Sequence, residues 1–360
     1  MEKVNGYLSS FQGKRVLVTG HTGFKGSWLA LWLNELGAEV MGYALPPKLA
    51  HDHFNLLDLG KRIRHVEGDI RNGEFFSKIC FEFRPEYIFH LAAQALVRLS
   101  YEDPKATFDT NVLGSVNVLE ASRKFPSLKA LVFITSDKCY RNKEWVWGYR
   151  ENDELGGRDP YSASKAAAEL VFGAYQDSFF YKQASLGAAT ARAGNVIGGG
   201  DWGCDRIVPD CIQALRGGRP IVIRNPNAVR PWQHVLEPLS GYLLLAVKLA
   251  QSAKDYAGGS WNFGPSGAAV RTVEELSRGI VQRWGEGKLT VDLSSSFPHE
   301  ANLLHLSIDK AVHHLGWRPR WDFEQTLDNT VSWYKSVLGG QSAYDVSRMQ
   351  IMKYAESFHD

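Results

Sequence analysis

The sequence predicts an α/β protein with a doubly wound parallel sheet, followed by a smaller mixed α/β part. Three observations lead to this fold class. Between Arg15 and Ala193, short apolar runs alternate with longer amphipathic ones, which is typical of βαβ units. The first apolar run ends in three closely spaced glycines. After residue 198 the chain changes to a glycine-rich loop and shorter mixed elements.

Each apolar run of the first half predicts one strand of the sheet. We expect these strands at 15–19, 39–44, 63–68, 87–92, 130–135 and 187–193. Helical periodicity fills the intervals between them, at 26–37, 73–84, 106–125 and 162–179. Because crossovers between parallel strands are right-handed, the helices should cover both faces of the sheet.

The later part of the chain is expected to form a second domain. We place a first domain at residues 1–195, to which some later strands and helices return, and a second at 196–360. A further helix is expected near 236–252, and the segment after residue 341 should be a surface helix or a loosely held tail.

Composition excludes several classes of function. The 360 residues carry a net charge of +2, with 44% hydrophobic and 22% charged residues, as in ordinary soluble globular proteins. No run of Lys and Arg predicts a nucleic-acid partner, and no apolar stretch approaches the roughly 20 residues of a membrane span. The four cysteines have neither disulfide-framework nor zinc-site spacing, so we expect a cytoplasmic protein without a metal site.

The glycines of "TGHTGFKG" lie where the first strand turns into the first helix. Gly20, Gly23 and Gly26 permit a tight turn there and let a pyrophosphate approach the backbone N–H groups of the helix N-terminus. A tight turn without a ligand is the alternative. The strand–turn–helix context favours a dinucleotide site.

This GxxGxxG spacing, together with "GDI" at 68–70, "HLAAQ" at 90–94 and Asn111, resembles the extended short-chain dehydrogenase/reductases. The resemblance implies a Rossmann fold and a bound NAD. Asp69 and Ile70 resemble the pair that contacts the adenine, and "LAAQ" resembles the turn beside the ribose and phosphates. The implied cofactor contacts are Gly20, Thr22, Gly23, Phe24, Gly26, Asp69, Ile70, Ala92, Ala93, Gln94, Tyr161 and Lys165.

One departure concerns the choice of cofactor. The second strand ends in "MGYALPPK" and offers no acid for the ribose hydroxyls of NAD. Lys48 is the nearest cation and could favour the 2′-phosphate of NADP instead. The resemblance still favours NAD.

Tyr161 and Lys165 stand four residues apart at the head of a helix, hence on one face. In the family, a tyrosine so placed takes the proton of a sugar hydroxyl while hydride leaves to nicotinamide. The lysine lowers the pKa of the phenol and binds the nicotinamide ribose. A solvated helix face is the alternative for an isolated YxxxK pattern.

The stretch "TSDK" follows the strand at 130–135, and the family resemblance gives Ser136 the contact with the sugar hydroxyl. Sugar-nucleotide 4,6-dehydratases add two proton-transfer groups after this residue, one for the C5 proton and one for the C6 oxygen. Here these are Asp137, as the acid, and Lys138, as the C5 base, where better-known relatives have Glu. A lysine must be neutral to act as a base, which burial and the nearby cation Lys165 would favour. A structural Asp137–Lys138 ion pair is the alternative.

Within the family, the blocks at 13–47, 135–170 and 191–202 resemble the CDP-glucose 4,6-dehydratases. This implies a lyase that makes CDP-4-keto-6-deoxyglucose for 3,6-dideoxyhexose and O-antigen synthesis, with NAD recycled. Two enzyme alternatives remain open, a UDP-N-acetylglucosamine 4,6-dehydratase and a nucleotide-sugar epimerase. A non-catalytic NAD-sensing regulator is the alternative from another class.

The resemblance also places the nucleotide-sugar contacts, namely Asn195, Arg206, Arg230 and Glu300. His234 is interpreted as a core histidine. A homodimer is implied through the helices at 104–124 and 161–181, with an apolar seam that includes Leu113, Val116 and Phe172.

Overall fold

The computed structural model describes residues 6–203, 205–266, 270–292 and 303–359. Its strands are β1 (Arg15–Thr19), β2 (Glu39–Ala44), β3 (Arg64–Glu67), β4 (Tyr87–His90), β5 (Ala130–Ile134), β6 (Gly187–Arg192), β7 (Val196–Ile197), β8 (Ile221–Ile223), β9 (Val229–Pro231), β10 (Gln233–His234), β11 (Ser260–Asn262), β12 (Val270–Thr272) and β13 (Leu289–Val291).

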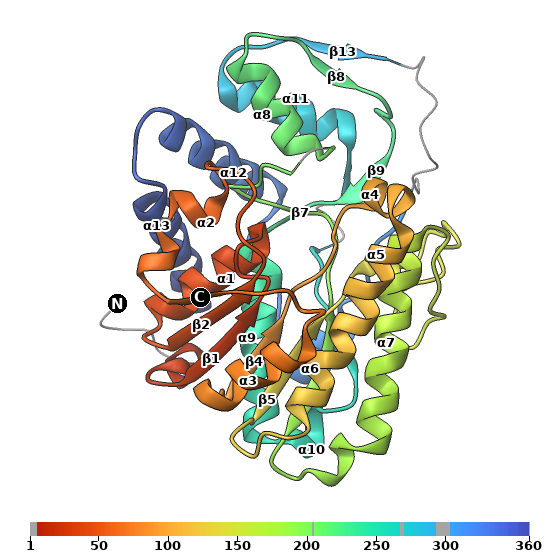
Figure 1. Cartoon of the computed structure of the whole chain (residues 1–360). Helices are drawn as coiled ribbons and strands as arrows, with labels where there is room; N and C mark the ends of the chain where they lie inside the picture. Colours follow the sequence, from red (N-terminus) through yellow and green to blue (C-terminus); the bar gives the residue numbers. More distant parts are fainter. Residues whose placement is uncertain (1–5, 204, 267–269, 293–302, 360) are drawn as a thin grey trace.

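The helices connect these strands in the alternating order that the sequence predicts (Figure 1). They are α1 (Phe24–Glu35), α2 (His53–Leu56), α3 (Gly73–Phe83), α4 (Val97–Glu102), α5 (Pro104–Phe108), α6 (Gly114–Ser122), α7 (Pro160–Ser178), α8 (Ile207–Arg216), α9 (Leu236–Gln251), α10 (Ala253–Tyr256), α11 (Val273–Trp284), α12 (Phe323–Leu338) and α13 (Ala343–Glu356). A π-helical segment, Asp109–Leu113, joins α5 to α6, so the single helix expected at 106–125 has three parts.

Seven strands form one parallel sheet in the order β11-β6-β5-β4-β1-β2-β3. The chain starts in the middle, winds outward through β2 and β3, and then returns to the other side of β1, which is the doubly wound arrangement. The predicted fold class is therefore confirmed. The six predicted strands are β1 to β6, each within two residues of its expected ends.

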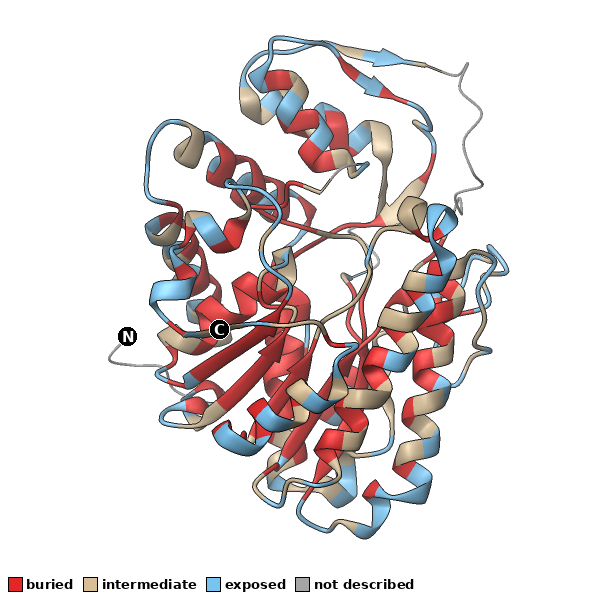
Figure 2. Cartoon of the chain, viewed as in Figure 1, coloured by how far each residue is buried: buried red, intermediate tan, exposed pale blue. Residues whose placement is uncertain are grey.

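Helices cover both faces of the sheet, which is why β1, β4, β5 and β6 are buried along almost their whole length (Figure 2), whereas the edge strand β3 has no buried residue. Alternate strand residues point to opposite faces. Leu17 of β1 packs with α3, α6 and α7, in a cluster that includes Phe76 and Phe172. Its neighbours Val16 and Val18 pack on the other side, with α1 and α9.

Later segments return to this sheet. Strand β11 pairs with β6 at its edge, and α9, the helix expected near 236–252, is buried over most of its length against β5 and β6. A smaller group of elements, β8, β9, β13, α8 and α11, lies above the sheet in Figure 1, and β12 pairs with β9 of this group. In the described part of the chain, no helix is both long and apolar enough to span a membrane.

One expectation about packing is wrong, because Phe172 lies in the core and not on an exposed helix face. The segment after residue 341 is the helix α13, one of the two forms expected for it, and it packs on α1 and α12 and buries Ile351 and Tyr354 completely. Its buried residues recur at helical spacing and form one face of the helix. Phe172 is only 2% exposed because it packs under α7 in the core, whereas Leu113 is 58% exposed and Leu170 65%.

Candidate active site

A cleft of about 2240 Å³ opens between the carboxyl ends of the strands and the smaller part above them. Residues directly after β1, β3, β4, β5 and β6 line its floor. Residues of α8, β8 and β9 line its other side. This is the position at which doubly wound sheets bind ligands, and it joins almost all of the predicted site residues that the structure describes.

The glycine turn lies at one end of the cleft. Gly20 has a φ of +75°, and a Cβ on Gly26 would lie 2.1 Å from the carbonyl oxygen of Gly20. A side chain on Gly26 would fill the space between the turn and the start of α1, and one on Gly20 would lie 2.8 Å from the backbone nitrogen of Ala92. Helix α1 has no acidic residue in its first turn. The turn therefore fits the pyrophosphate of a dinucleotide.

Two other predicted cofactor contacts line the same end of the cleft. Thr22 donates a hydrogen bond from Oγ1 to the carbonyl of Leu45 at 2.9 Å, which ties the glycine turn to the end of β2. Phe24 begins α1 and also lines the cleft.

Asp69 and Ile70 follow β3 and line the cleft. The Asp69 carboxylate accepts hydrogen bonds from the guanidinium of Arg71, and this bonding holds the pKa of Asp69 below its usual value. Ile70 is buried against Gly114, where a Cβ would lie 2.6 Å from the Ile70 side chain.

Ala92 and Ala93 line the cleft, but Gln94 does not. The Gln94 side chain instead donates to Thr107 at 2.9 Å and accepts from the backbone N–H of Leu96. Its backbone is held by Asn111, which also donates to Ser164 of α7. Gln94 thus stabilises the turn after β4 from outside the cleft.

Tyr161 and Lys165 lie on the first two turns of α7, and both side chains reach the cleft. The helix begins with Pro160 at its first position, and Asp159 caps it by accepting from the N–H of Ser162 at 2.9 Å. Burial lowers the pKa of Lys165 to about 8.

The pKa of Tyr161 is raised to about 12, mainly by burial; a hydrogen bond with Ser136 and the charge of Arg206 oppose the shift, while the Asp137 carboxylate adds to it. The expected lowering of this pKa is therefore not found in this structure. Burial outweighs the cations around the phenol.

Ser136, Asp137 and Lys138 form a tight turn at the end of β5. Ser136 begins the turn by accepting from the N–H of Lys138, and its hydroxyl donates to Asp137 Oδ1 at 2.9 Å. Asp137 is buried, at 3% exposure. Between these described residues there is no Asp137–Lys138 ion pair, so the structural alternative is not observed.

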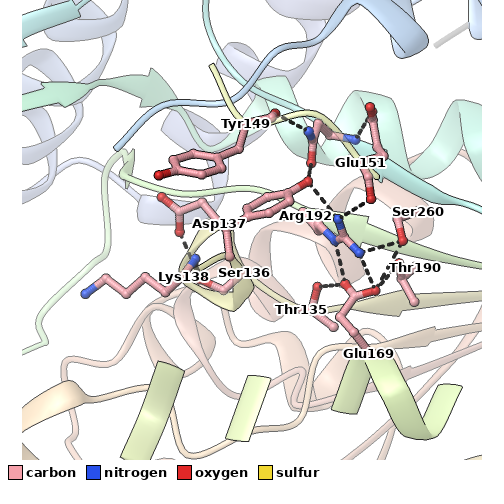
Figure 3. A network of polar contacts seen from close by, with 12 residues as sticks. Thr135, Ser136, Asp137, Lys138, Tyr149, Glu151, Glu169, Thr190, Arg192 and Ser260 are labelled. Carbon is pink, nitrogen blue, oxygen red and sulfur yellow. Dashed lines mark hydrogen bonds and ion pairs between the residues drawn. The ribbon is translucent and has the colours of Figure 1, made fainter. Parts of the chain in front are cut away.

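Lys138 is exposed rather than buried, because its side chain extends into the open cleft (Figure 3). The expectation that burial keeps it neutral is therefore wrong for this structure. Its Nζ lies 6.0 Å from the centroid of the Tyr161 ring. Asp137 and Lys138 thus reach the cleft beside the tyrosine from opposite sides of one turn.

Of the predicted substrate contacts, Arg206 and Arg230 lie on the other side of the cleft, and Asn195 lies near its floor. Asn195, with a φ of +45°, follows β6, and Arg206 pairs with Asp201 at 2.9 Å just before α8. Arg230 lies on β9. Glu300 lies outside the described residues. His234 is fully buried between Trp28 and Trp321, as expected for a core histidine.

Sequence reasoning missed two residues of the site. Lys25, inside the glycine turn, lines the cleft, where burial lowers its pKa to about 8 and the Asp137 carboxylate opposes this. A Cβ on Gly194 would lie 1.8 Å from Asp137 Oδ2, so only glycine leaves room for this carboxylate. The charged residue within "GFKG" was a usable signal for Lys25. The sequence around Gly194 carries no comparable one.

Comparisons with known proteins place the chain among nucleotide-sugar enzymes. It is 49% identical over 348 residues to a CDP-glucose 4,6-dehydratase of Salmonella typhimurium, a match that covers 96% of this chain and 97% of that protein. It is 27% identical to a dTDP-glucose 4,6-dehydratase of Xanthomonas campestris, over 88% and 92% of the two chains.

Solved structures agree with this placement. A dTDP-glucose 4,6-dehydratase of Streptomyces venezuelae, with NAD and a second ligand bound, superposes with a TM-score of 0.74 at 26% identity, over 90% of this chain and 98% of that one. The model of the GDP-mannose 4,6 dehydratase family matches residues 17–330. This match covers most of the sheet and both sides of the cleft, and the chain therefore belongs to the GDP-mannose 4,6 dehydratase family.

Proposed function

We propose that the protein is an NAD-dependent carbon–oxygen lyase that converts CDP-glucose to CDP-4-keto-6-deoxyglucose and water. The observation that carries this proposal is the turn Ser136–Lys138, which brings an acid and an amine into the cleft beside Tyr161. The 49% identity to a CDP-glucose 4,6-dehydratase over nearly the whole chain supports the choice of substrate.

Residues 1–195 would carry most of the cofactor site. The turn at Gly20, Gly23 and Gly26 would hold the pyrophosphate, with Thr22 and Phe24 beside it, while Asp69 and Ile70 would face the adenine and Lys165 the nicotinamide ribose. NAD, when bound there, supplies the acceptor for the C4 hydride and the donor for C6. Relatives solved with NAD support this choice over NADP.

The protein side chains divide the proton transfers among themselves. Tyr161, with Ser136 beside it, takes the proton of the C4 hydroxyl. The resulting ketone acidifies the C5 proton, which Lys138 removes, and Asp137 protonates the departing C6 oxygen. When the hydride returns to C6, C5 regains a proton from Lys138. Proton transfers at the C4 oxygen, C5 and the C6 oxygen need three groups at one end of the cleft, and β5 and α7 provide them.

Residues 196–360 would mainly bind the nucleotide sugar. Arg206 and Arg230 are the cations that we assign to the diphosphate, because a guanidinium forms paired hydrogen bonds with phosphate oxygens. Asn195 and Glu300 would contact the sugar diphosphate and a ribose hydroxyl, respectively.

We further propose a cytoplasmic homodimer that supplies 3,6-dideoxyhexose and O-antigen synthesis. The helices expected to pair, at 104–124 and 161–181, carry the exposed apolar residues Leu113 and Leu170. This seam would replace the one that included Phe172.

The test of this function is to incubate the purified protein with NAD and either CDP-glucose or UDP-N-acetylglucosamine, and to follow the product mass. We expect loss of one water from CDP-glucose alone. Loss of water from the other sugar would change the substrate, and a product of unchanged mass but altered C4 configuration would identify an epimerase. No reaction with either sugar would contradict the proposal and favour a regulatory NAD-binding protein.

A further inference from the structure

A buried ion pair lies behind the Ser136–Lys138 turn. The carboxylate of Glu169 on α7 and the guanidinium of Arg192 at the end of β6 are joined by two hydrogen bonds, from Nε at 2.8 Å and from Nη2 at 2.9 Å. Both side chains are only 3% exposed. Although burial raises the pKa of Glu169, the bonds from Arg192 hold it below its ordinary value.

The Arg192 guanidinium uses all of its donors (Figure 3). Besides Glu169 it donates to the Tyr140 hydroxyl at 2.7 Å, to the carbonyl of Glu151 at 3.0 Å and to Ser260 Oγ at 2.7 Å. The pair thereby joins β6, β11, α7 and the segment after the turn. Such complete pairing offsets the cost of burying two charges.

This ion pair holds the Ser136–Lys138 turn at both of its ends. Before the turn, Thr135 donates from Oγ1 to Glu169 Oε1 at 2.5 Å. After it, the Tyr140 hydroxyl accepts from Arg192 and donates to Asn262 Oδ1 at 2.8 Å. Among the described residues, Ser136, Asp137 and Lys138 themselves make no hydrogen bond to Glu169 or Arg192. The turn is therefore connected to the ion pair only through Thr135 and Tyr140 in the described structure.

The same ion pair is fixed to the helix that carries the tyrosine. Glu169 follows Tyr161 by eight residues and Lys165 by four on α7, so the three side chains share one face of the helix. A shift of α7 along its axis would therefore move Glu169 and Tyr161 together. The position of the turn relative to Tyr161 depends on the bonds that Glu169 and Arg192 make to Thr135 and Tyr140.

We propose that Glu169 and Arg192 are positioning residues, which set the distance between Tyr161 and the Asp137 and Lys138 side chains. This inference rests on the proposed function. A buried ion pair contributes little net stability compared with apolar packing, whereas a shift of about 1 Å between reacting groups costs about 10²-fold in rate. The geometry therefore matters more for catalysis than for folding.

Two matched pairs of substitutions test this without removing either charge. Thr135→Val and Thr190→Val each delete one hydroxyl that donates to Glu169, Thr190 at 2.8 Å from the neighbouring strand β6. Tyr140→Phe and Ser260→Ala each delete one hydroxyl bound to Arg192. In each pair only the first residue adjoins the Ser136–Lys138 turn.

The measurements are the melting temperature, kcat and KM for CDP-glucose, and hydrogen exchange of the peptide 135–140. We expect similar losses of melting temperature within each pair. Thr135→Val and Tyr140→Phe should lower kcat at least tenfold, with KM within twofold, and should speed exchange of the peptide severalfold. Thr190→Val and Ser260→Ala should keep kcat within twofold and leave the exchange unchanged.

Equal changes of kcat within each pair would overturn the positioning role, because the network would then act through stability alone. A Thr135→Val enzyme with normal kcat would overturn it as well. If the unsubstituted protein makes no product from CDP-glucose, the proposed function fails. The positioning role of Glu169 and Arg192 is then tested by the hydrogen exchange alone. Equal exchange of peptide 135–140 in both members of each pair would in that case refute the positioning role.

Discussion

Replacing Lys138 with methionine tests the assignment of the C5 base. The side chain is exposed in the cleft, so its loss should change the free energy of unfolding by no more than about 0.5 kcal/mol. Loss of a general base typically costs 10²- to 10⁴-fold in rate, which corresponds to about 2.7 to 5.4 kcal/mol in the barrier. We therefore expect a folded protein in which elimination is slowed by at least 10²-fold.

The assay runs the reaction with CDP-glucose in D₂O and follows two masses, the loss of water and the uptake of deuterium at C5. Lys138→Met should lose both, while oxidation at C4, read from the reduced cofactor at 340 nm, continues. Lys143→Met is the matched control, since Lys143 lines the same cleft but pairs with Glu154 at 3.5 Å. Normal C5 exchange in Lys138→Met would refute the assignment.

Three further predictions concern other residues around the cleft and the core. Asp137→Asn should keep C5 exchange in D₂O but slow water loss at least 10²-fold; equal loss of both would contradict its role as the acid toward C6. Gly194→Ala places a Cβ 1.8 Å from Asp137 Oδ2. It should therefore lower kcat at least tenfold and lower the free energy of unfolding by about 1–3 kcal/mol. Unchanged kcat and melting temperature would contradict this close contact. Burial raises the pKa of Glu237 to about 7. The folded state therefore retains a proton that the unfolded chain releases above about pH 4.5. The free energy of unfolding should fall by up to about 3 kcal/mol as the pH rises from there to 7. The melting temperature of Glu237→Gln relative to the unsubstituted protein should therefore rise between pH 5 and 7.5, and a constant difference would contradict the shift.

The sheet could be predicted because its strands are apolar on both faces. Runs such as Ala130–Ile134 are buried at every position, and a run of five residues has the length of a strand and is too short for a buried helix. The partners of helix α13 could not be predicted. Its buried residues, Val346, Ile351 and Tyr354 among them, share one face of the helix, but the elements that cover this face, α1, α2 and α12, come from distant parts of the sequence.

The active site likewise contains residues whose arrangement could be predicted from the sequence and residues whose arrangement could not. The glycine turn and the Tyr161–Lys165 pair could be predicted because local spacing determines their geometry. The exposure of Lys138 and the direction of the Tyr161 pKa shift could not, since both depend on residues far apart in the sequence that surround the cleft. Gly194 illustrates the reason, because its role is the absence of a side chain beside a carboxylate 57 positions earlier.

The exposure of Lys138 also bears on how this lysine could act as a base. Lys25, Lys165 and Arg206 also line this cleft. A substrate that covers the cleft would remove solvent from Lys138, and loss of solvent favours the neutral form of an amine. Proton removal from C5 should therefore depend on a substrate that covers the cleft. The same cover should shield Lys138, which should react with an amine-selective reagent more slowly when CDP-glucose is present than with CMP alone. Equal reactivity under both conditions would contradict this explanation.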